Sequence, residues 1–166
     1  STNNPDGGPP TCGGELFQAA KVNSNMLIAL DKSGSMSELI GGVSKWNIAT
    51  AAVRSVTSQY EAQIQFGLQM FPAGGTTALT CTIPTQSVSV GNLRAAPISN
   101  ALDGGAPGGR TPIGGVLTAC GAIPELRDPS RANYVMLVTD GMETCNGNGI
   151  AAATYNLADA GIKTFV

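Results

Sequence analysis

Oxygen-bearing side chains stand at two places in this sequence where a run of apolar residues ends. The apolar run at 26–30 stops at Asp31, and Ser33 and Ser35 follow at alternate positions of one tight turn. A second apolar stretch ends in the letters VTDG at 138–141, which include Asp140. Carboxylates and hydroxyls are hard ligands that suit Mg²⁺, Ca²⁺ or Mn²⁺ and suit zinc and copper poorly. These residue types predict a site for a divalent cation.

A third donor comes from a glycine-rich stretch in the middle of the chain. The segment LDGGAPGGRTPIGG at 102–115 has too many glycines and prolines for a regular element, so it predicts a loop. Within it, Thr111 precedes Pro112 at the expected start of a helix, where the threonine can serve as N-cap. Two carboxylates balance a divalent charge, and three hydroxyls add none. An octahedral ion held by these groups keeps one position open, for which the Asp or Glu of a partner is the natural ligand.

The residue types that are missing exclude several function classes. The chain contains no histidine, so no Ser-His-Asp or Cys-His pair and no histidine-ligated zinc can form. Nine Lys and Arg against eleven Asp and Glu give a net charge of −2 without a basic cluster, which argues against a nucleic-acid partner. No segment approaches the about 20 apolar residues of a membrane helix, and nothing at Ser1 resembles a signal peptide. We expect a soluble, already processed protein that does not insert into a membrane.

The four cysteines indicate the compartment. Cys12, Cys81, Cys120 and Cys145 are widely spaced and form no C-x-x-C pair. An even number of such cysteines in a lightly charged, glycine-rich domain favours two disulfides over buried free thiols, with three pairings open. We therefore expect an exported protein that is extracellular, on the cell surface or periplasmic, with all four cysteines oxidised.

Apolar periodicity predicts the elements that position these side chains. Continuous apolar runs predict buried parallel strands, alternation of Val with Ser predicts an antiparallel edge strand, and apolar steps of three and four predict helices. The predicted strands are 26–30, 64–71, 87–90 at the edge, 134–139 and 162–166; the predicted helices are 45–61, one with Pro112 at its first position, and 150–160. This order predicts a three-layer, Rossmann-like α/β fold, with a mostly parallel central sheet, one antiparallel edge strand and helices on both faces.

The chain is expected to fold as one domain at 12–166 behind a flexible linker. Residues 1–11 are rich in Pro, Gly and Asn and hold no aliphatic side chain, so they have nothing to bury. The helix at 45–61 has Ser44 as its N-cap and carries Trp46 and Tyr60 on its apolar stripe, which predicts that both aromatic side chains lie in the core.

Together these residues resemble the von Willebrand factor A (vWA) family. Its metal-ion-dependent adhesion site uses an Asp-x-Ser-x-Ser turn, a Thr from a middle loop and an Asp at a later strand end. A Ser-Gly turn or an Asp-Gly pair alone is more often a helix cap or a turn, but their joint placement at neighbouring strand ends favours a metal site. The resemblance maps the site onto Asp31, Ser33, Ser35, Thr111 and Asp140. It implies Mg²⁺, or Ca²⁺ or Mn²⁺, as the ion, and a further strand and C-terminal helix beyond Val166.

The resemblance is to secreted bacterial members and implies a non-catalytic module. We expect it to bind a protein partner that donates Asp or Glu to the metal. Lys32 and Met36 in the turn and Arg110 beside Thr111 are candidate partner contacts, although an exposed loop arginine can also be simply solvated. Two other functions stay open. One is a structural stalk whose metal only stabilises the fold. The other is a phosphoryl-transfer enzyme, but that chemistry needs a second acidic residue at the position that Ser33 occupies, which argues against it.

Overall fold

The computed structural model describes residues 22–74, 80–145 and 149–166. The predicted linker at 1–11 and Cys12 lie outside the described residues. None of the described helices is long and apolar enough to cross a membrane.

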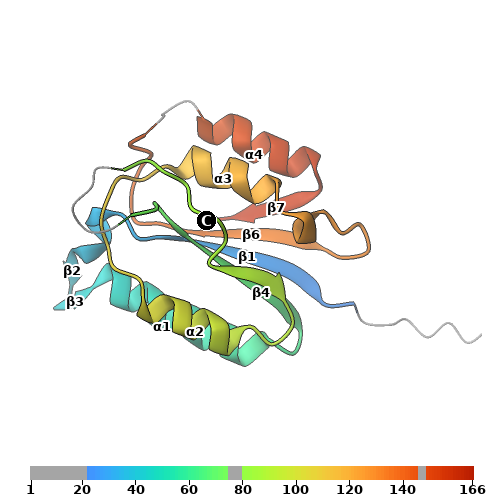
Figure 1. The fold of residues 1–166 in the computed structure, drawn as a ribbon, viewed down its shortest axis with the longest axis horizontal. Helices are drawn as coiled ribbons and strands as arrows, with labels where there is room; N and C mark the ends of the chain where they lie inside the picture. Colours follow the sequence, from blue (N-terminus) through green and yellow to red (C-terminus); the bar gives the residue numbers. More distant parts are fainter. Residues whose placement is uncertain (1–21, 75–79, 146–148) are drawn as a thin grey trace, which may run out of the picture.

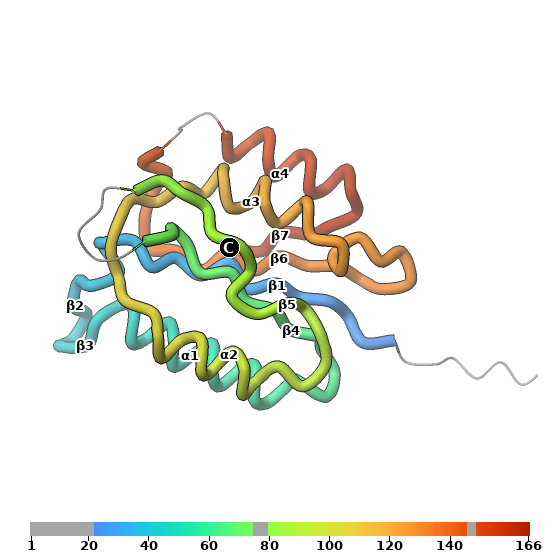
Figure 2. Tube along the Cα trace, viewed as in Figure 1, coloured from blue at the N-terminus to red at the C-terminus, as the bar shows by residue number. Residues whose placement is uncertain are grey.

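A five-stranded sheet in the order β5-β4-β1-β6-β7 forms the centre of the molecule (Figure 1). Its strands are β1 (Ser24–Asp31), β4 (Ile64–Phe71), β5 (Val88–Gly91), β6 (Asn133–Val138) and β7 (Ile162–Phe165). All neighbours pair in parallel except β4 and β5, and Figure 2 shows β5 beside β4 at the edge. Leu30 pairs with Met70 on one side and with Val138 on the other, so β1, β4 and β6 end at the same edge. The predicted sheet is confirmed.

Two pairs of helices cover the two faces of this sheet (Figure 1). Helices α1 (Lys45–Tyr60) and α2 (Ala95–Asp103) lie on one face, and α3 (Ile113–Gly121) and α4 (Gly149–Asp159) lie on the other. Alternate residues of β1 serve the two cores: Leu27 packs into the α3/α4 core and Ile28 into the α1/α2 core, and both are buried. This explains the continuous apolar run in the sequence and confirms the three-layer architecture.

Helix α1 begins as the sequence predicts, but the aromatic side chain at its end is not in the core. The Ser44 side chain accepts a hydrogen bond from the backbone N–H of Asn47 and caps the helix. Trp46 is 7% exposed, and its ring lies so close to Gly105 that a Cβ there would come within 2.5 Å of it. Tyr60 is 42% exposed, so its predicted place in the core is wrong. It is the last residue of α1.

The middle of the chain is more regular than its composition predicts. Helix α2 was not predicted, because Pro97 lies in its first turn and Leu102 was assigned to the loop. The available signal was the i, i+4 pair of Ile98 and Leu102, both of which are buried. Gly114 and Gly115 belong to α3 rather than to the loop. A Cβ on Gly114 would lie 2.9 Å from the carbonyl carbon of Gly149, so glycine allows α3 and α4 to approach closely. The actual loop therefore spans residues 104–112.

A short hairpin between β1 and α1 was also missed. Strands β2 (Leu39–Ile40) and β3 (Val43–Ser44) pair with each other, after a 3-10 turn at Gly34–Ser37. Gly41 and Gly42 both have positive φ and make the tight turn between the two strands. Two-residue strands give no periodicity that a sequence pattern can reveal.

Candidate metal centre

Asp31 ends β1 and closes the turn that follows it. Its side chain is 0% exposed. One oxygen, Oδ1, accepts the backbone N–H of Ser33 at 2.7 Å, and the other, Oδ2, accepts the hydroxyl of Thr139 at 2.6 Å. Thr139 follows β6, so this second bond joins the two neighbouring strand ends. The carboxylate is thereby held at the edge where the strands terminate.

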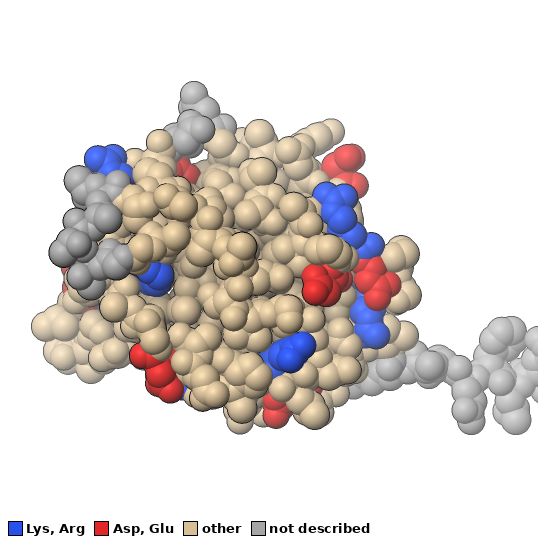
Figure 3. All heavy atoms as spheres, in the orientation of Figure 1, with Lys and Arg blue, Asp and Glu red and all other residues tan. Residues whose placement is uncertain are grey.

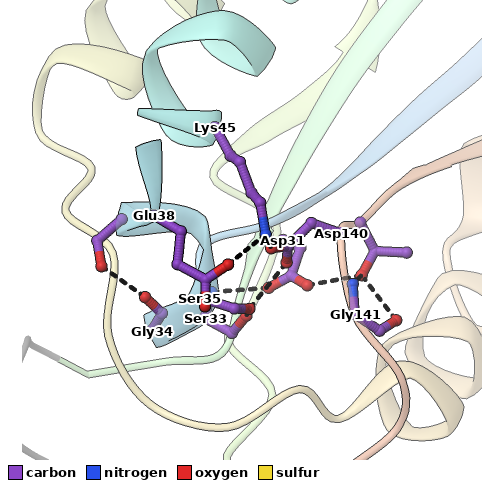
Figure 4. Close-up of polar contacts among 10 residues, drawn as sticks. Asp31, Ser33, Gly34, Ser35, Glu38, Lys45, Asp140 and Gly141 are labelled. Carbon is purple, nitrogen blue, oxygen red and sulfur yellow. Dashed lines mark hydrogen bonds and ion pairs between the residues drawn. The ribbon is translucent and has the colours of Figure 1, made fainter. Parts of the chain in front are cut away.

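A chain of polar side chains continues from this turn to Asp140 (Figure 4). The hydroxyls of Ser33 and Ser35 share a hydrogen bond of 3.1 Å, and the Ser35 hydroxyl donates to Asp140 Oδ1 at 2.8 Å. The structure therefore places four of the five predicted metal ligands in one connected group.

Thr111 is carried to the same group by the glycine-rich loop. Gly34 N–H donates to Gly109 O at 3.1 Å, and Gly108 N–H donates to Lys32 O at 2.7 Å, which docks the loop on the Asp31 turn. A Cβ on Gly141 would lie 3.7 Å from Ser35 Oγ and 3.9 Å from Thr111 Oγ1, so both hydroxyls lie beside this glycine. All five predicted ligands are therefore brought together.

The predicted capping role of Thr111 is wrong. Pro112 occupies the N-cap position of α3, and no side chain caps that helix. Thr111 N–H donates to the hydroxyl of Thr144 at 2.8 Å, and Thr144 N–H donates to Thr111 O at 3.1 Å. These backbone bonds fix the residue without using its hydroxyl.

The electrostatics around Asp31 favour a bound cation. Burial raises the pKa of Asp31, the hydrogen bonds from Thr139 and Ser33 oppose this rise, and the nearby charge of Asp140 adds to it. The hydrogen bonds that the structure gives to Asp31 come from neutral donors. A buried charge is costly unless it is paired with a charge or a metal ion. Within the described ranges no three His, Cys, Asp or Glu cluster together, so the site relies on hydroxyls as well as carboxylates.

Lys45 is a site residue that the sequence analysis missed. Its Nζ donates to Asp140 Oδ2 and to Glu38 Oε2, both at 2.6 Å, reaching the site from the first residue of α1 (Figure 4). The partial positive charge of a helix N-terminus disfavours a lysine at this position. The signal available in the sequence was a lysine at the start of a helix, ten residues after the Asp-x-Ser-x-Ser turn, because such a lysine needs a nearby carboxylate.

The three candidate partner contacts have different environments. Met36 is 2% exposed and packs in the α1/α2 core, so its prediction as a partner contact is wrong. Met36 is the buried residue of the short 3-10 turn at Gly34–Ser37. Lys32 donates from Nζ to Gly74 O at 2.8 Å, and Arg110 donates from Nη1 to Thr144 O at 3.2 Å. Arg110 is exposed beside Thr111 and stays a predicted partner contact.

A disulfide joins two of the loops at this end of the sheet. Cys81 and Cys145 are bridged across 64 residues of sequence. Their neighbours hold the glycine-rich loop from both sides, because Arg110 N–H donates to Thr80 O and Thr144 bonds to Thr111. The bridge therefore supports the residues that position Thr111.

The second predicted disulfide is not formed at Cys120. This residue is a free thiol, buried in the α3/α4 core, where Sγ lies 3.9 Å from Gln69 Oε1. Cys12 lies outside the described residues. The expectation that all four cysteines are oxidised is therefore wrong at Cys120, whose apolar surroundings suit a small hydrophobic side chain.

Cys120 is expected to resist alkylation in the folded protein. Burial raises the pKa of its thiol to about 12, so at pH 8 almost none of it is the reactive thiolate. Iodoacetamide at pH 8 should leave Cys120 unmodified under native conditions and modify it after unfolding without a reductant, as read by peptide mass spectrometry. Failure to label the unfolded, unreduced chain would show that Cys120 is disulfide-bonded.

Sequence comparison relates the chain to two proteins of Bacillus subtilis (strain 168). It is 30% identical to YwmC, an uncharacterized protein, over 139 residues, which is 81% of this chain and 61% of YwmC. It is 30% identical to YwmD, also uncharacterized, over 156 residues, which is 90% of this chain and 69% of YwmD. The chain belongs to the YwmD family. It spans 61% and 69% of the two relatives, and no protein-family model matches it.

Comparison with solved structures identifies the fold of this YwmD-family chain. The SpRpn10 VWA domain superposes with a TM-score of 0.63 at 11% identity, covering 86% of this chain and 73% of that one. Proximal thread matrix protein 1 of the mussel byssus gives 0.65 at 18% identity over 87% of this chain and 37% of that one. The vWF domain of the pili tip protein Mfa5 of Porphyromonas gingivalis gives 0.58 at 15% identity, covering 76% and 40%. The chain therefore has a vWA fold, as the resemblance implied.

Proposed function

We propose that this protein binds one divalent cation at the edge of its sheet and uses it to bind a protein partner. Asp31 and Asp140 supply charge, and Ser33, Ser35 and Thr111 supply neutral oxygens. Mg²⁺ is the expected ion, with Ca²⁺ and Mn²⁺ as alternatives that accept the same ligands. An Asp or Glu of the partner completes the coordination. No catalytic step is assigned to the site.

The complete burial of Asp31 carries this proposal. Its carboxylate has hydrogen bonds from neutral donors at 2.7 and 2.6 Å, and a cation is the group that would compensate its charge. Both Ser35 and Thr111 direct hydroxyls to the neighbourhood of Gly141, beside the same turn. A site of two carboxylates and three hydroxyls fits a hard divalent ion.

The comparisons support an adhesion or interaction module without fixing its partner. One structure of the mussel protein is described as having a zinc-occupied metal-ion-dependent adhesion site, and Mfa5 is described as a pilus tip protein. The Cys81–Cys145 disulfide supports export to an oxidising compartment. On the face in Figure 3, basic and acidic side chains are interspersed, and neither sign forms one large patch. This distribution fits recognition through a local site rather than through a large charged surface.

The direct test separates metal binding from partner binding. Mn²⁺ is titrated into the purified protein and followed by calorimetry and by electron paramagnetic resonance. An array of acidic peptides, each paired with its Asn or Gln version, is then probed with and without Mg²⁺. Mg²⁺-dependent binding to the acidic peptides alone supports the proposal. Metal binding that stabilises the fold without any carboxylate preference would assign the ion a structural role, and no metal binding would refute both parts.

Replacing Thr111 by Ala is expected to weaken Mn²⁺ binding only moderately. Water can replace a neutral hydroxyl, so the affinity should fall by about tenfold or less, whereas the loss of a charged ligand costs more. The two hydrogen bonds between Thr111 and Thr144 use the backbone of Thr111 and not its side chain, so the loop should stay in place. Thr111→Ser keeps the hydroxyl and is the matched control, expected to bind like the wild type. Equal affinity of the Ala and Ser variants would remove Thr111 from the ligand set.

A further inference from the structure

Lys45 makes the one contact in the described site that brings a full positive charge to a predicted metal ligand. Its ammonium lies 2.6 Å from Asp140 Oδ2 and 2.6 Å from Glu38 Oε2. The Asp140 side chain is 12% exposed and Glu38 is 64% exposed, so the contact with Asp140 is the better shielded of the two. Figure 4 shows the lysine reaching from the start of α1 to the carboxylates.

The position of Lys45 is unfavourable for the helix that carries it. The N-terminus of a helix has a partial positive charge, which a lysine in the first turn opposes. Ser44 already caps α1 through Asn47 N–H, so the lysine adds nothing to the capping. Its contribution therefore lies in the carboxylates it contacts.

Both carboxylates of the proposed site have each of their oxygens engaged. Asp140 Oδ1 accepts from Ser35 and Oδ2 accepts from Lys45. Asp31 Oδ1 accepts from the N–H of Ser33 and Oδ2 accepts from Thr139. Each carboxylate oxygen has two lone pairs, so a hydrogen bond from a neutral donor leaves it able to bind an ion as well, whereas the ammonium of Lys45 places a positive charge directly against Asp140 Oδ2. The bond from Lys45 is the charged one and is the harder to replace.

This arrangement distinguishes between the two common hard cations. Mg²⁺ takes six ligands at about 2.0–2.1 Å in near-ideal octahedral geometry, whereas Ca²⁺ takes six to eight at about 2.3–2.6 Å and often uses a carboxylate through both oxygens. An ion bound at Asp140 Oδ2 would be repelled by the ammonium 2.6 Å away, so the site offers an ion Asp140 Oδ1 rather than both oxygens. Such a site suits Mg²⁺ and leaves Ca²⁺ short of protein oxygens.

We propose that Lys45 is a positioning residue that sets the metal selectivity of this site. By holding a positive charge against Asp140 Oδ2, it disfavours binding of an ion through both oxygens of Asp140 and so disfavours Ca²⁺ relative to Mg²⁺. This inference rests on the proposed metal site and goes beyond it, because it assigns the choice of ion to a residue outside the ligand set.

The test compares the Mg²⁺ and Ca²⁺ affinities of Lys45→Met with those of the wild type by calorimetry. Methionine keeps the unbranched apolar stem of the side chain and removes the charged ammonium. Both affinities should rise as a competing charge is lost, but that for Ca²⁺ should rise about tenfold more, because Asp140 can then bind through both oxygens. Lys45→Arg keeps a charged donor and should retain the wild-type ratio of the two affinities.

Lys32→Met is the matched control for the general effect of charge. Lys32 lies in the same turn, but its Nζ donates to Gly74 O and not to a carboxylate. This variant should change both affinities alike and leave their ratio unchanged. An equal gain for both ions in Lys45→Met would show that Lys45 acts only as a competing charge and would overturn the selectivity inference. Failure of the wild type and Lys45→Met to bind either ion would refute the proposed site itself.

Discussion

Asp31→Ala is expected to abolish divalent-cation binding, and with it binding to acidic peptides, while the protein stays folded. The side chain supplies one of only two carboxylates in the proposed site, and no neutral water can restore its charge. The two cores that flank β1 contain Leu27, Ile28 and their apolar neighbours and do not include this carboxylate. Binding of Mn²⁺ followed by paramagnetic resonance and far-UV circular dichroism of the same sample measure the two outcomes.

The isosteric variant Asp31→Asn adds a thermodynamic signature to this loss. Burial raises the pKa of Asp31, so the charged form destabilises the metal-free fold, and an uncharged amide should be at least as stable in excess chelator. Adding Mg²⁺ at about 100 times its Kd should stabilise the wild type by about 2.7 kcal/mol and leave the variant unchanged. The order of the two melting temperatures should therefore reverse between chelator and Mg²⁺.

Asp159→Ala is the matched control for these measurements. Asp159 is an exposed carboxylate at the end of α4, on the opposite side of the fold from α1. Its loss should leave both cation binding and the response to Mg²⁺ as in the wild type. Undiminished peptide binding by Asp31→Ala, or by the wild type in excess chelator, would place the partner surface elsewhere.

Removing the Cys81–Cys145 disulfide is expected to have the largest effect on stability. The bridge closes 64 residues of sequence, and the chain-entropy estimate for such a loop is about 4 kcal/mol of unfolding free energy. The double variant Cys81→Ala/Cys145→Ala should unfold at a correspondingly lower urea concentration. Mn²⁺ affinity should also fall, because Thr80 and Thr144, which flank the cysteines, hold Arg110 and Thr111 in place.

Reduction of the wild type provides the comparison for this double variant. Wild-type protein treated with a reductant should match the variant in both urea midpoint and Mn²⁺ affinity, since Cys120 is already a thiol. A variant that is less stable but binds Mn²⁺ with unchanged affinity would show that the bridge supports the fold alone. That result would contradict its role in positioning Thr111.

The residues that could be predicted from the sequence are those whose environment is set by one element. Asp31 and Asp140 each follow a buried apolar run, so strand topology alone placed them at one edge. The Asp-x-Ser-x-Ser spacing then placed the two serines. Thr111 was predicted as a ligand, but its N-cap role was wrong because Pro112 takes that position. Such details depend on how a loop docks against a neighbour, which no periodicity encodes.

The features that the sequence did not reveal depend on contacts between distant segments. Lys45 contacts Asp140 across 95 residues, and its role follows from a packing arrangement rather than from a motif. Met36 lies in a turn rich in polar residues, yet it is buried in the α1/α2 core. Gly114 read as a loop residue, but its contact with Gly149 requires glycine inside a helix. In each case the tertiary neighbour, absent from the local sequence, decides the outcome.

The position of Asp31 has a mechanical consequence. The residue ends the central strand, and β1 is paired in parallel along its length with β4 on one side and β6 on the other. A tensile load applied to Asp31 along the axis of β1 would act in shear on both rows of hydrogen bonds at once, so that many bonds share it rather than breaking one after another. An attachment made at this point would transmit force directly into the central strand of the sheet.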